Sequence, residues 1–169
     1  MPSLLNKKRI LALDCGNKYT GIVLADVGED TVEIIILDLY VDDTNMKTSL
    51  VDYLNEKIMP LMLPYDPCKT LILYEKVFYM NWNLLRVNGN TVKHFTSLGR
   101  TSMALSPSQK EGVVTGLNRK TDIVSEMRKW LYDNHPWSIE IFDSFERKHD
   151  VADALGMILY AKKYGFYNK

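Results

Sequence analysis

The sequence predicts an α/β fold in which a mixed five-stranded sheet is flanked by helices. Runs of β-branched and apolar residues recur in the first half of the chain, where they indicate strands. Apolar residues at helical spacing follow in the second half. The length of 169 residues and the 46% hydrophobic content fit one core, so we expect residues 1–169 to form a single domain.

The first half of the chain is expected to form most of the sheet. Three short apolar runs are predicted strands: residues 9–13, 20–25 and 31–37. Gly28 begins the turn that makes the last two a hairpin. A helix then starts near Leu50 and ends at Pro60 and Pro64, and a buried strand follows at residues 70–74.

The second half is expected to supply the helices that cover this sheet. A helix interrupted near Gly89 is predicted within residues 81–98. Thr121 caps an amphipathic helix, and the last helix starts near His149. The fifth strand is predicted at residues 102–105, and residues 139–142 are a candidate for one last short strand. This order of elements is compatible with the RNase H-like fold.

Composition restricts the class of protein. No apolar run approaches the ~20 residues that a membrane helix needs, and the first residues do not resemble a secretory signal. Cys15 and Cys68 stand in unrelated contexts, which predicts neither a disulfide framework nor a zinc site. We therefore expect a reduced protein of the cytoplasm that does not associate with a membrane.

The charges balance overall but are distributed unevenly. With 21 basic and 21 acidic residues the chain is neutral, whereas nucleic-acid binders are usually basic. Residues 26–56 hold nine acids and one lysine, while residues 84–129 hold eight basic residues and three acids. An ordinary mixed surface explains this pattern as well as a face that attracts phosphate does.

Four carboxylates stand where predicted buried elements meet solvent. Asp14 ends the first strand, Glu75 ends the strand at residues 70–74, and Asp150 and Asp153 lie three apart at the start of the last helix. A turn, a loop or a helix start would explain each one alone. Together they match the hard oxygen ligands that Mg²⁺ prefers, and two such ions about 4 Å apart can promote phosphodiester cleavage.

At these positions the sequence resembles the RuvC family of crossover junction endonucleases. Four motifs carry the resemblance in the family's order: D-x-G-x-x-x-T-G at residues 14–21, E-x-V-F at 75–78, K-x-x-V-V-x-G-x-x-x-K at 110–120 and D-x-A-D-A-L at 150–155. They span nearly the whole chain, and the last two make the match fairly specific. Cys15 departs from the proline usual in the bacterial family, and the D-V-A-D form is shared with resolvases of the poxvirus type.

The resemblance implies a homodimer that cuts four-way (Holliday) DNA junctions by paired nicks, in the cytoplasm of a bacterium or of a host cell. It implies that two Mg²⁺ ions, replaceable by Mn²⁺, are held by the four carboxylates: Asp14, Glu75, Asp150 and Asp153. Lys110 and Lys120 would act near the scissile phosphate, and Phe78 would stack at the opened junction, although such an aromatic is as often a core residue. Further basic residues are candidates for backbone phosphate contacts: Arg86, Lys93, Arg100 and Arg119.

Three other functions stay open from the sequence. A ribonuclease of the same fold, which cuts RNA in RNA–DNA hybrids, would keep the carboxylates, but in that class the glutamate lies on a helix rather than at the end of a strand. A kinase-like ATPase would share a D-x-G-x-x-x-T-G turn but needs a second such domain. A DNA-binding domain without catalysis is the third alternative.

Overall fold

The strands form one mixed sheet, as the sequence predicts. The computed structural model describes residues 6–16, 18–42, 49–75, 91, 93–105 and 123–168. The strand order is β3-β2-β1-β4-β5, and the five strands are β1 Lys8–Cys15, β2 Tyr19–Val27, β3 Val32–Val41, β4 Thr70–Glu75 and β5 Ser102–Leu105. Neighbouring strands β1, β2 and β3 are antiparallel, whereas β4 runs parallel to β1 and β5 runs parallel to β4.

The first three strands form a meander with tight connections. The Gly16 amide donates to the Tyr19 carbonyl at 2.7 Å across the β1–β2 turn, and the Gly28 amide donates to the Thr31 carbonyl at 2.9 Å across the β2–β3 turn. The strands extend beyond the apolar runs in the sequence because paired backbone, and not side-chain character alone, defines their ends.

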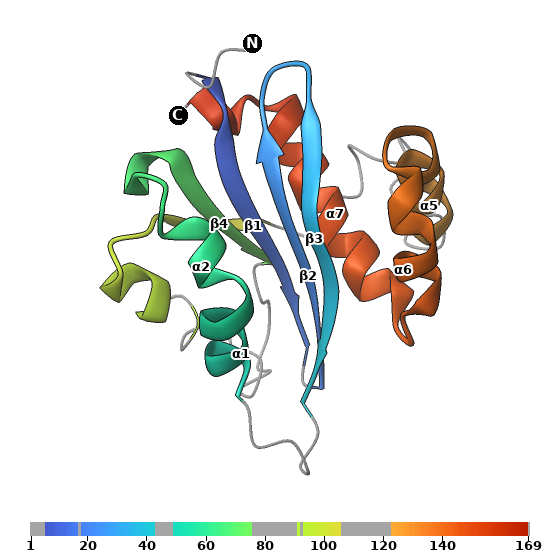
Figure 1. Cartoon of the computed structure of the whole chain (residues 1–169), viewed down its shortest axis with the longest axis horizontal. Helices are drawn as coiled ribbons and strands as arrows, with labels where there is room; N and C mark the ends of the chain where they lie inside the picture. Colours follow the sequence, from blue (N-terminus) through green and yellow to red (C-terminus); the bar gives the residue numbers. More distant parts are fainter. Residues whose placement is uncertain are drawn as a thin grey trace.

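Helices cover both faces of the sheet (Figure 1). Helix α7 (Lys148–Lys163) lies on one face, with α5 (Ile123–Asn134) and α6 (Ile139–Ser144) outside it. Helices α1 (Leu50–Lys57) and α2 (Met59–Met62) lie on the other face. Because successive strand residues point to opposite faces, Ile10 and Ala12 of β1 pack beneath α7 while Leu11 and Leu13 pack beneath α1 and α2.

Helix α7 is the central helix of the larger core. Its apolar residues are fully buried over most of its length, including Val151, Leu155 and Ile158. A helix buried on so much of its circumference is expected in the middle of a domain, with its first turn in contact with the sheet. Its place therefore fixes where the acidic residues of that first turn lie.

Two predictions about elements are wrong. Residues 139–142 form part of α6 and not a strand: Pro136 starts a short 3-10 helix, Pro136–Ser138, that runs directly into α6. Ile139 packs against the core and Phe142 is fully buried, which is helical spacing, while Ile141 is 40% exposed. Pro60 also does not end the helical region, because it occupies the first turn of α2, where a missing amide hydrogen costs nothing.

Candidate active site

Asp14 and Glu75 end neighbouring parallel strands on the same face of the sheet. Leu13 pairs with Tyr74 in the β1–β4 ladder, so the residues that follow them, Asp14 and Glu75, lie side by side at the ends of these two strands. Asp14 follows Ala12 by two residues, and so points to the α7 face, where it is 8% exposed. The expectation that these two carboxylates meet because their strands pair is confirmed.

Helix α7 brings a third carboxylate to the same place because β2 carries a glycine there. Gly21 is paired with Asp14 across the β1–β2 ladder. A Cβ atom on Gly21 would lie 2.1 Å from the carbonyl oxygen of Asp150 and 2.7 Å from the amide nitrogen of Val151. Only a residue without a side chain lets the first turn of α7 approach the sheet this closely.

The three carboxylates form one group that could hold a metal ion. Oxygen atoms of Asp14, Glu75 and Asp153 all lie within 4.8 Å of one another. The donors come from β1, β4 and α7 and are all carboxylates, without sulfur or imidazole. Hard oxygen donors of this kind fit Mg²⁺ or Mn²⁺ better than softer metals, so the residues present fit the ions that the sequence resemblance implies.

Asp150 lies outside this group of three. Its Oδ2 atom is 3.5 Å from Nε of Arg147, and its Oδ1 atom is 3.5 Å from Nε2 of His149. The Asp150 side chain is 13% exposed, so it sits at the edge of the site rather than in solvent. The structure thus brings together three of the four predicted metal ligands and pairs the fourth with an arginine.

The residue after Asp14 points to the other face and is chemically inert. Cys15 belongs to the core beneath α1 and α2, and burial next to the Asp14 carboxylate raises the pKa of its thiol to about 12. A buried thiol with such a pKa is not a nucleophile near neutral pH. Neither Cys15 nor the exposed Cys68 forms a disulfide.

The predicted DNA-contacting residues divide into three groups. Five lie outside the described residues: Phe78, Arg86, Lys110, Arg119 and Lys120. Lys93 is exposed on a helical segment at residues 93–97. Arg100 is 7% exposed, and its guanidinium donates to the carbonyl of Tyr65 at 2.8 Å and to the hydroxyl of Thr70 at 3.1 Å.

The burial of Arg100 corrects its predicted role. A guanidinium that already donates to buried acceptors cannot reach a DNA phosphate without leaving them unpaired. We therefore regard Arg100 as the residue that holds the connection from α2 to β4 against the start of β5. No sequence pattern predicts this burial, since an arginine between a helix and a strand is usually exposed.

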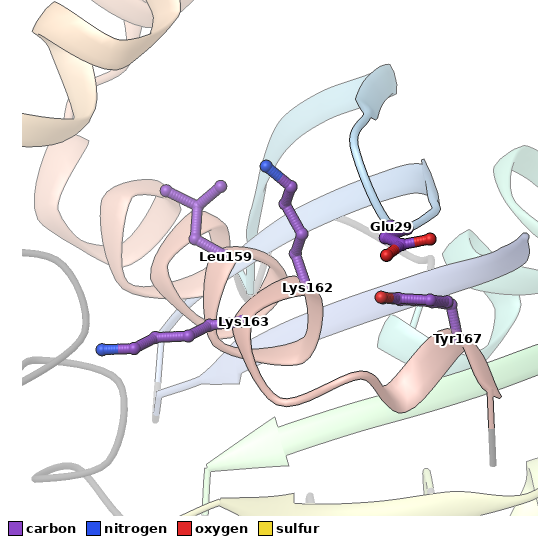
Figure 2. A pocket seen from close by; sticks show the side chains of 5 residues that line it. All are labelled: Glu29, Leu159, Lys162, Lys163 and Tyr167. Carbon is purple, nitrogen blue, oxygen red and sulfur yellow. The ribbon is translucent and has the colours of Figure 1, made fainter.

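Two hollows among the described residues lie away from the carboxylates. One of about 410 Å³ is lined by Leu159, Lys162 and Lys163 of α7, Glu29 of the β2–β3 turn and Tyr167 (Figure 2). Lys162 is nine residues from Asp153, or about 14 Å along a helix. A second hollow, of about 190 Å³, lies at the start of β1, beside Lys8 and Tyr65. Neither is a candidate active site.

Comparison with known proteins identifies the fold. No protein-family model and no curated protein matches the sequence. Among solved structures, Thermus thermophilus RuvC in complex with a Holliday junction substrate is 13% identical, covers 94% of this chain and 96% of its own, and has a TM-score of 0.67. The chain has the RNase H-like fold of RuvC-type resolvases.

Two further resolvases share this fold. The fowlpox virus resolvase in complex with Holliday junction DNA is 14% identical, with a TM-score of 0.66 over 92% of this chain and 97% of its own. The yeast mitochondrial Holliday junction resolvase Ydc2 is 17% identical, with a TM-score of 0.65 over 95% of this chain and 80% of its own. The likeness extends over nearly the whole length, so the fold class predicted from the sequence is confirmed.

Two elements of the site escaped the sequence interpretation. Gly21 belongs to the D-x-G-x-x-x-T-G motif, but nothing assigned it a role; a glycine inside a strand pattern is itself a signal of close backbone approach. Arg147 and Lys148, which stand shortly before Asp150 in the sequence, likewise had no predicted role. Among the described residues no helix is both long and apolar enough to cross a membrane.

Proposed function

We propose that this protein is a divalent-metal-dependent endonuclease that cuts four-way DNA junctions. The observation that carries the proposal is the convergence of Asp14, Glu75 and Asp153 within 4.8 Å, at the edge of a sheet with the fold of junction resolvases. Solved structures of two proteins with that fold contain Holliday junction DNA. The junction substrate is inferred for this chain from those neighbours and from the sequence motifs.

Asp14, Glu75 and Asp153 would hold the metal, which we take to be Mg²⁺ with Mn²⁺ as a substitute. Two such ions, when bound, would lower the pKa of an attacking water and stabilise charge on the departing 3′ oxygen. Asp14 is nearly buried, so it would be a rigid ligand, whereas Glu75 and Asp153 are half-buried and open toward solvent. The site can therefore admit a phosphodiester from the solvent side while the sheet holds the ligands in place.

Asp150 would join the metal ligands only by giving up Arg147. Its carboxylate lies one helical turn before Asp153, which keeps it close enough to exchange partners. In the arrangement described, its charge is balanced by Arg147 instead. We therefore assign Asp150 a supporting role, and its predicted place among the ligands stays a prediction.

Residues beyond the carboxylates complete the proposal. Lys110 and Lys120 would stabilise negative charge that develops on the scissile phosphate. Arg86, Lys93 and Arg119 would contact backbone phosphates, which position DNA without reading its sequence. Phe78 would stack on a base at the opened junction. Of these, Lys93 is exposed, as such a contact requires.

Resolution of a junction needs two matching cuts, so we propose that the active form is a homodimer. A twofold axis would present one carboxylate group to each of the two strands that are cut. A ribonuclease of the same fold is the alternative. It is disfavoured because Glu75 ends β4 and does not lie on a helix.

A substrate panel tests the proposal. The wild-type protein and Asp153→Asn are incubated with a synthetic four-way junction, a linear duplex and an RNA–DNA hybrid, each with Mg²⁺ or Mn²⁺. We expect paired nicks in the junction alone, and none from Asp153→Asn even though it still binds the junction. Cleavage of the hybrid would instead establish the ribonuclease, and absence of all cleavage would leave a DNA-binding domain.

A further inference from the structure

A stack of cations and one tyrosine lies beside the carboxylate group. Tyr19 starts β2, just after the tight turn from Asp14, and its ring is flanked by two cations. The guanidinium carbon of Arg147 lies 5.0 Å from the ring centroid and Nζ of Lys18 lies 5.3 Å from it. Both distances allow cation–π attraction, so the ring holds two positive charges at one edge of the site.

The position of this stack is fixed from two sides. Tyr19 Oη donates a hydrogen bond to Glu146 Oε1 at 3.0 Å, which ties the start of β2 to the residue before Arg147. Arg147 in turn is the residue that precedes α7, three residues before Asp150 and six before Asp153. The stack therefore connects the turn after Asp14 to the helix that carries the third carboxylate.

The basic residues at the start of α7 do not stabilise the helix, so helix stability does not explain their presence. Arg147 and Lys148 stand at the N-terminus of α7, the positive end of the helix dipole, where basic side chains are unfavourable. Asp150 offsets only part of this charge. Lys148 donates to the carbonyl of Phe145 at 3.0 Å, but Arg147 keeps 43% of its side chain exposed and Lys18 is exposed.

Arg147 has donors to offer an incoming anion. Its contacts with described residues use Nε, 3.5 Å from Asp150, and Nη2, which donates to Nε2 of His149 at 3.0 Å. A guanidinium has five N–H groups in a rigid fork that matches the oxygens of a phosphate. A carboxylate site repels a phosphodiester until cations at its rim offset that charge, so this half-exposed fork lies where such a contact is needed.

We infer that Arg147, steadied by Tyr19 and assisted by Lys18, contacts a DNA backbone phosphate next to the one that is cut. The inference deepens the proposed function and rests on it, because it names a contact of the same site. In this account Arg147 and Lys18 bind DNA. Tyr19 is a positioning residue, which acts by holding the guanidinium in place.

Binding measurements in EDTA test this contact without any cleavage. Fluorescence anisotropy of a labelled four-way junction is followed over a range of salt concentrations for wild type, Arg147→Ala, Arg147→Lys and Tyr19→Phe. Arg128→Ala is the matched control, since Arg128 is a half-exposed arginine whose guanidinium pairs with Asp143 at 2.8 Å on α5 and α6, away from the carboxylates. Thermal unfolding of each variant checks that it is folded.

We expect Arg147→Ala to weaken junction binding about tenfold and to reduce the magnitude of the salt slope by about one, as loss of one phosphate contact does. Arg147→Lys should recover part of the affinity and the full slope, since it keeps the charge but not the fork. Tyr19→Phe should weaken binding less and leave the slope unchanged. Arg128→Ala should bind as wild type does.

The inference would be overturned if folded Arg147→Ala bound the junction with the same affinity and the same salt slope as the wild type. If the wild type also nicks the junction, the proposed function survives that result and only the phosphate contact fails. If the wild type cuts nothing but Arg147→Ala still lowers affinity and slope, Arg147 is a DNA phosphate contact, but the nuclease fails and with it the place of this contact beside a cut. A wild type that binds no DNA overturns both.

Discussion

Asp150 and Asp153 share one turn of α7 but have different surroundings. Asp153 lies with Asp14 and Glu75, whereas Asp150 pairs with Arg147. We predict that Asp153→Asn lowers the rate of junction cleavage at least about a hundredfold, because a lost metal ligand removes several kcal/mol of transition-state stabilisation. Asp150→Asn should cost about tenfold, as residues that support the ligands typically do. Single-turnover rates on a synthetic junction measure both.

Equal losses from the two variants would show that Asp150 leaves Arg147 and binds metal once DNA is present. Glu140→Gln serves as a control for charge, since it removes an exposed carboxylate of α6 that lies outside the group of three. Its cleavage rate should stay near that of the wild type.

Binding of metal should also be visible without DNA. A ligand that binds only the folded state adds about 2.7 kcal/mol to the free energy of unfolding when its concentration is a hundred times its dissociation constant. We predict that the melting temperature of the wild type rises with Mg²⁺ or Mn²⁺ and that this rise is lost in Asp153→Asn. The same rise in the variant would place the ion elsewhere.

The sequence predicts the position of a site residue when strand pairing determines it, and fails to do so when tertiary packing determines it. Asp14 and Glu75 could be placed together because strand pairing dictates it, and each ends an apolar run. Asp153 could be grouped with them by residue type and by the family resemblance, but not by strand pairing. Its distance from the strands depends on how α7 crosses the sheet, which single-sequence patterns do not encode. The partners of Arg100 and Arg147 are tertiary contacts and were equally out of reach.

At the scale of elements, the contact between α7 and β2 is the most sensitive one. An alanine Cβ at Gly21 would overlap the backbone of Asp150, so the first turn of α7 must shift away from the sheet. We predict that Gly21→Ala destabilises the protein by about 1–3 kcal/mol, as overpacking does. It should also lower the cleavage rate, because it displaces Asp153. Urea unfolding and single-turnover cleavage measure the two effects.

Gly28→Ala is the matched control for Gly21→Ala. Its Cβ would meet the flexible side chain of Lys7 at 3.1 Å, at the other end of β2. It should change stability little and leave cleavage intact. If Gly21→Ala behaved in the same way, the packing of α7 against the sheet would not be what sets the site.

His135 couples the end of α5 to β3 and should make stability depend on pH. Its Nε2 atom accepts a hydrogen bond from the amide of Ile34 at 3.3 Å, and its ring lies between Trp130 and Trp137. Burial lowers the pKa of His135 below its usual value of 6.5, although Glu33 opposes the shift. The unfolded chain therefore takes up this proton more readily than the folded one.

The free energy of unfolding should consequently fall as the pH drops below about 6.5, where the unfolded state gains the proton first. We expect urea unfolding at pH 5.0 and 7.5 to show a larger difference for the wild type than for His135→Gln, which keeps an acceptor but does not titrate. Identical differences in the two proteins would mean that His135 is not responsible.

Helices and strands were predicted correctly where the local sequence pattern and the tertiary packing favour the same secondary structure. Strands β1 to β5 are apolar runs bounded by turns, and pairing merely lengthens them. Helix α6 is the exception: its six residues carry too few turns for helical spacing to show, and two isoleucines with a phenylalanine suggest a strand. The 3-10 turn that starts it decides the outcome, and that turn depends on the packing of Ser138 and Phe142.

At the scale of the whole molecule, where the charges lie matters more for DNA binding than their total does. The formal net charge is zero, which as a total argues against a DNA-binding protein. Acidic ligands contribute to that total, while Lys18 and Arg147 place positive charge beside them. An enzyme that binds DNA through local cations needs no overall excess, so we expect junction binding to weaken steeply with salt.

The proposed homodimer predicts that the two cuts in a junction occur together. A supercoiled plasmid that extrudes an inverted repeat as a cruciform carries one four-way junction, and paired nicks convert it directly to linear DNA. We predict linear product from the wild type with Mg²⁺, none from Asp153→Asn, and none from a plasmid without the repeat. Nicked circles alone would refute paired cutting. Equal cleavage of the plasmid without the repeat, or no cleavage of either, would contradict the claim that this carboxylate site resolves junctions.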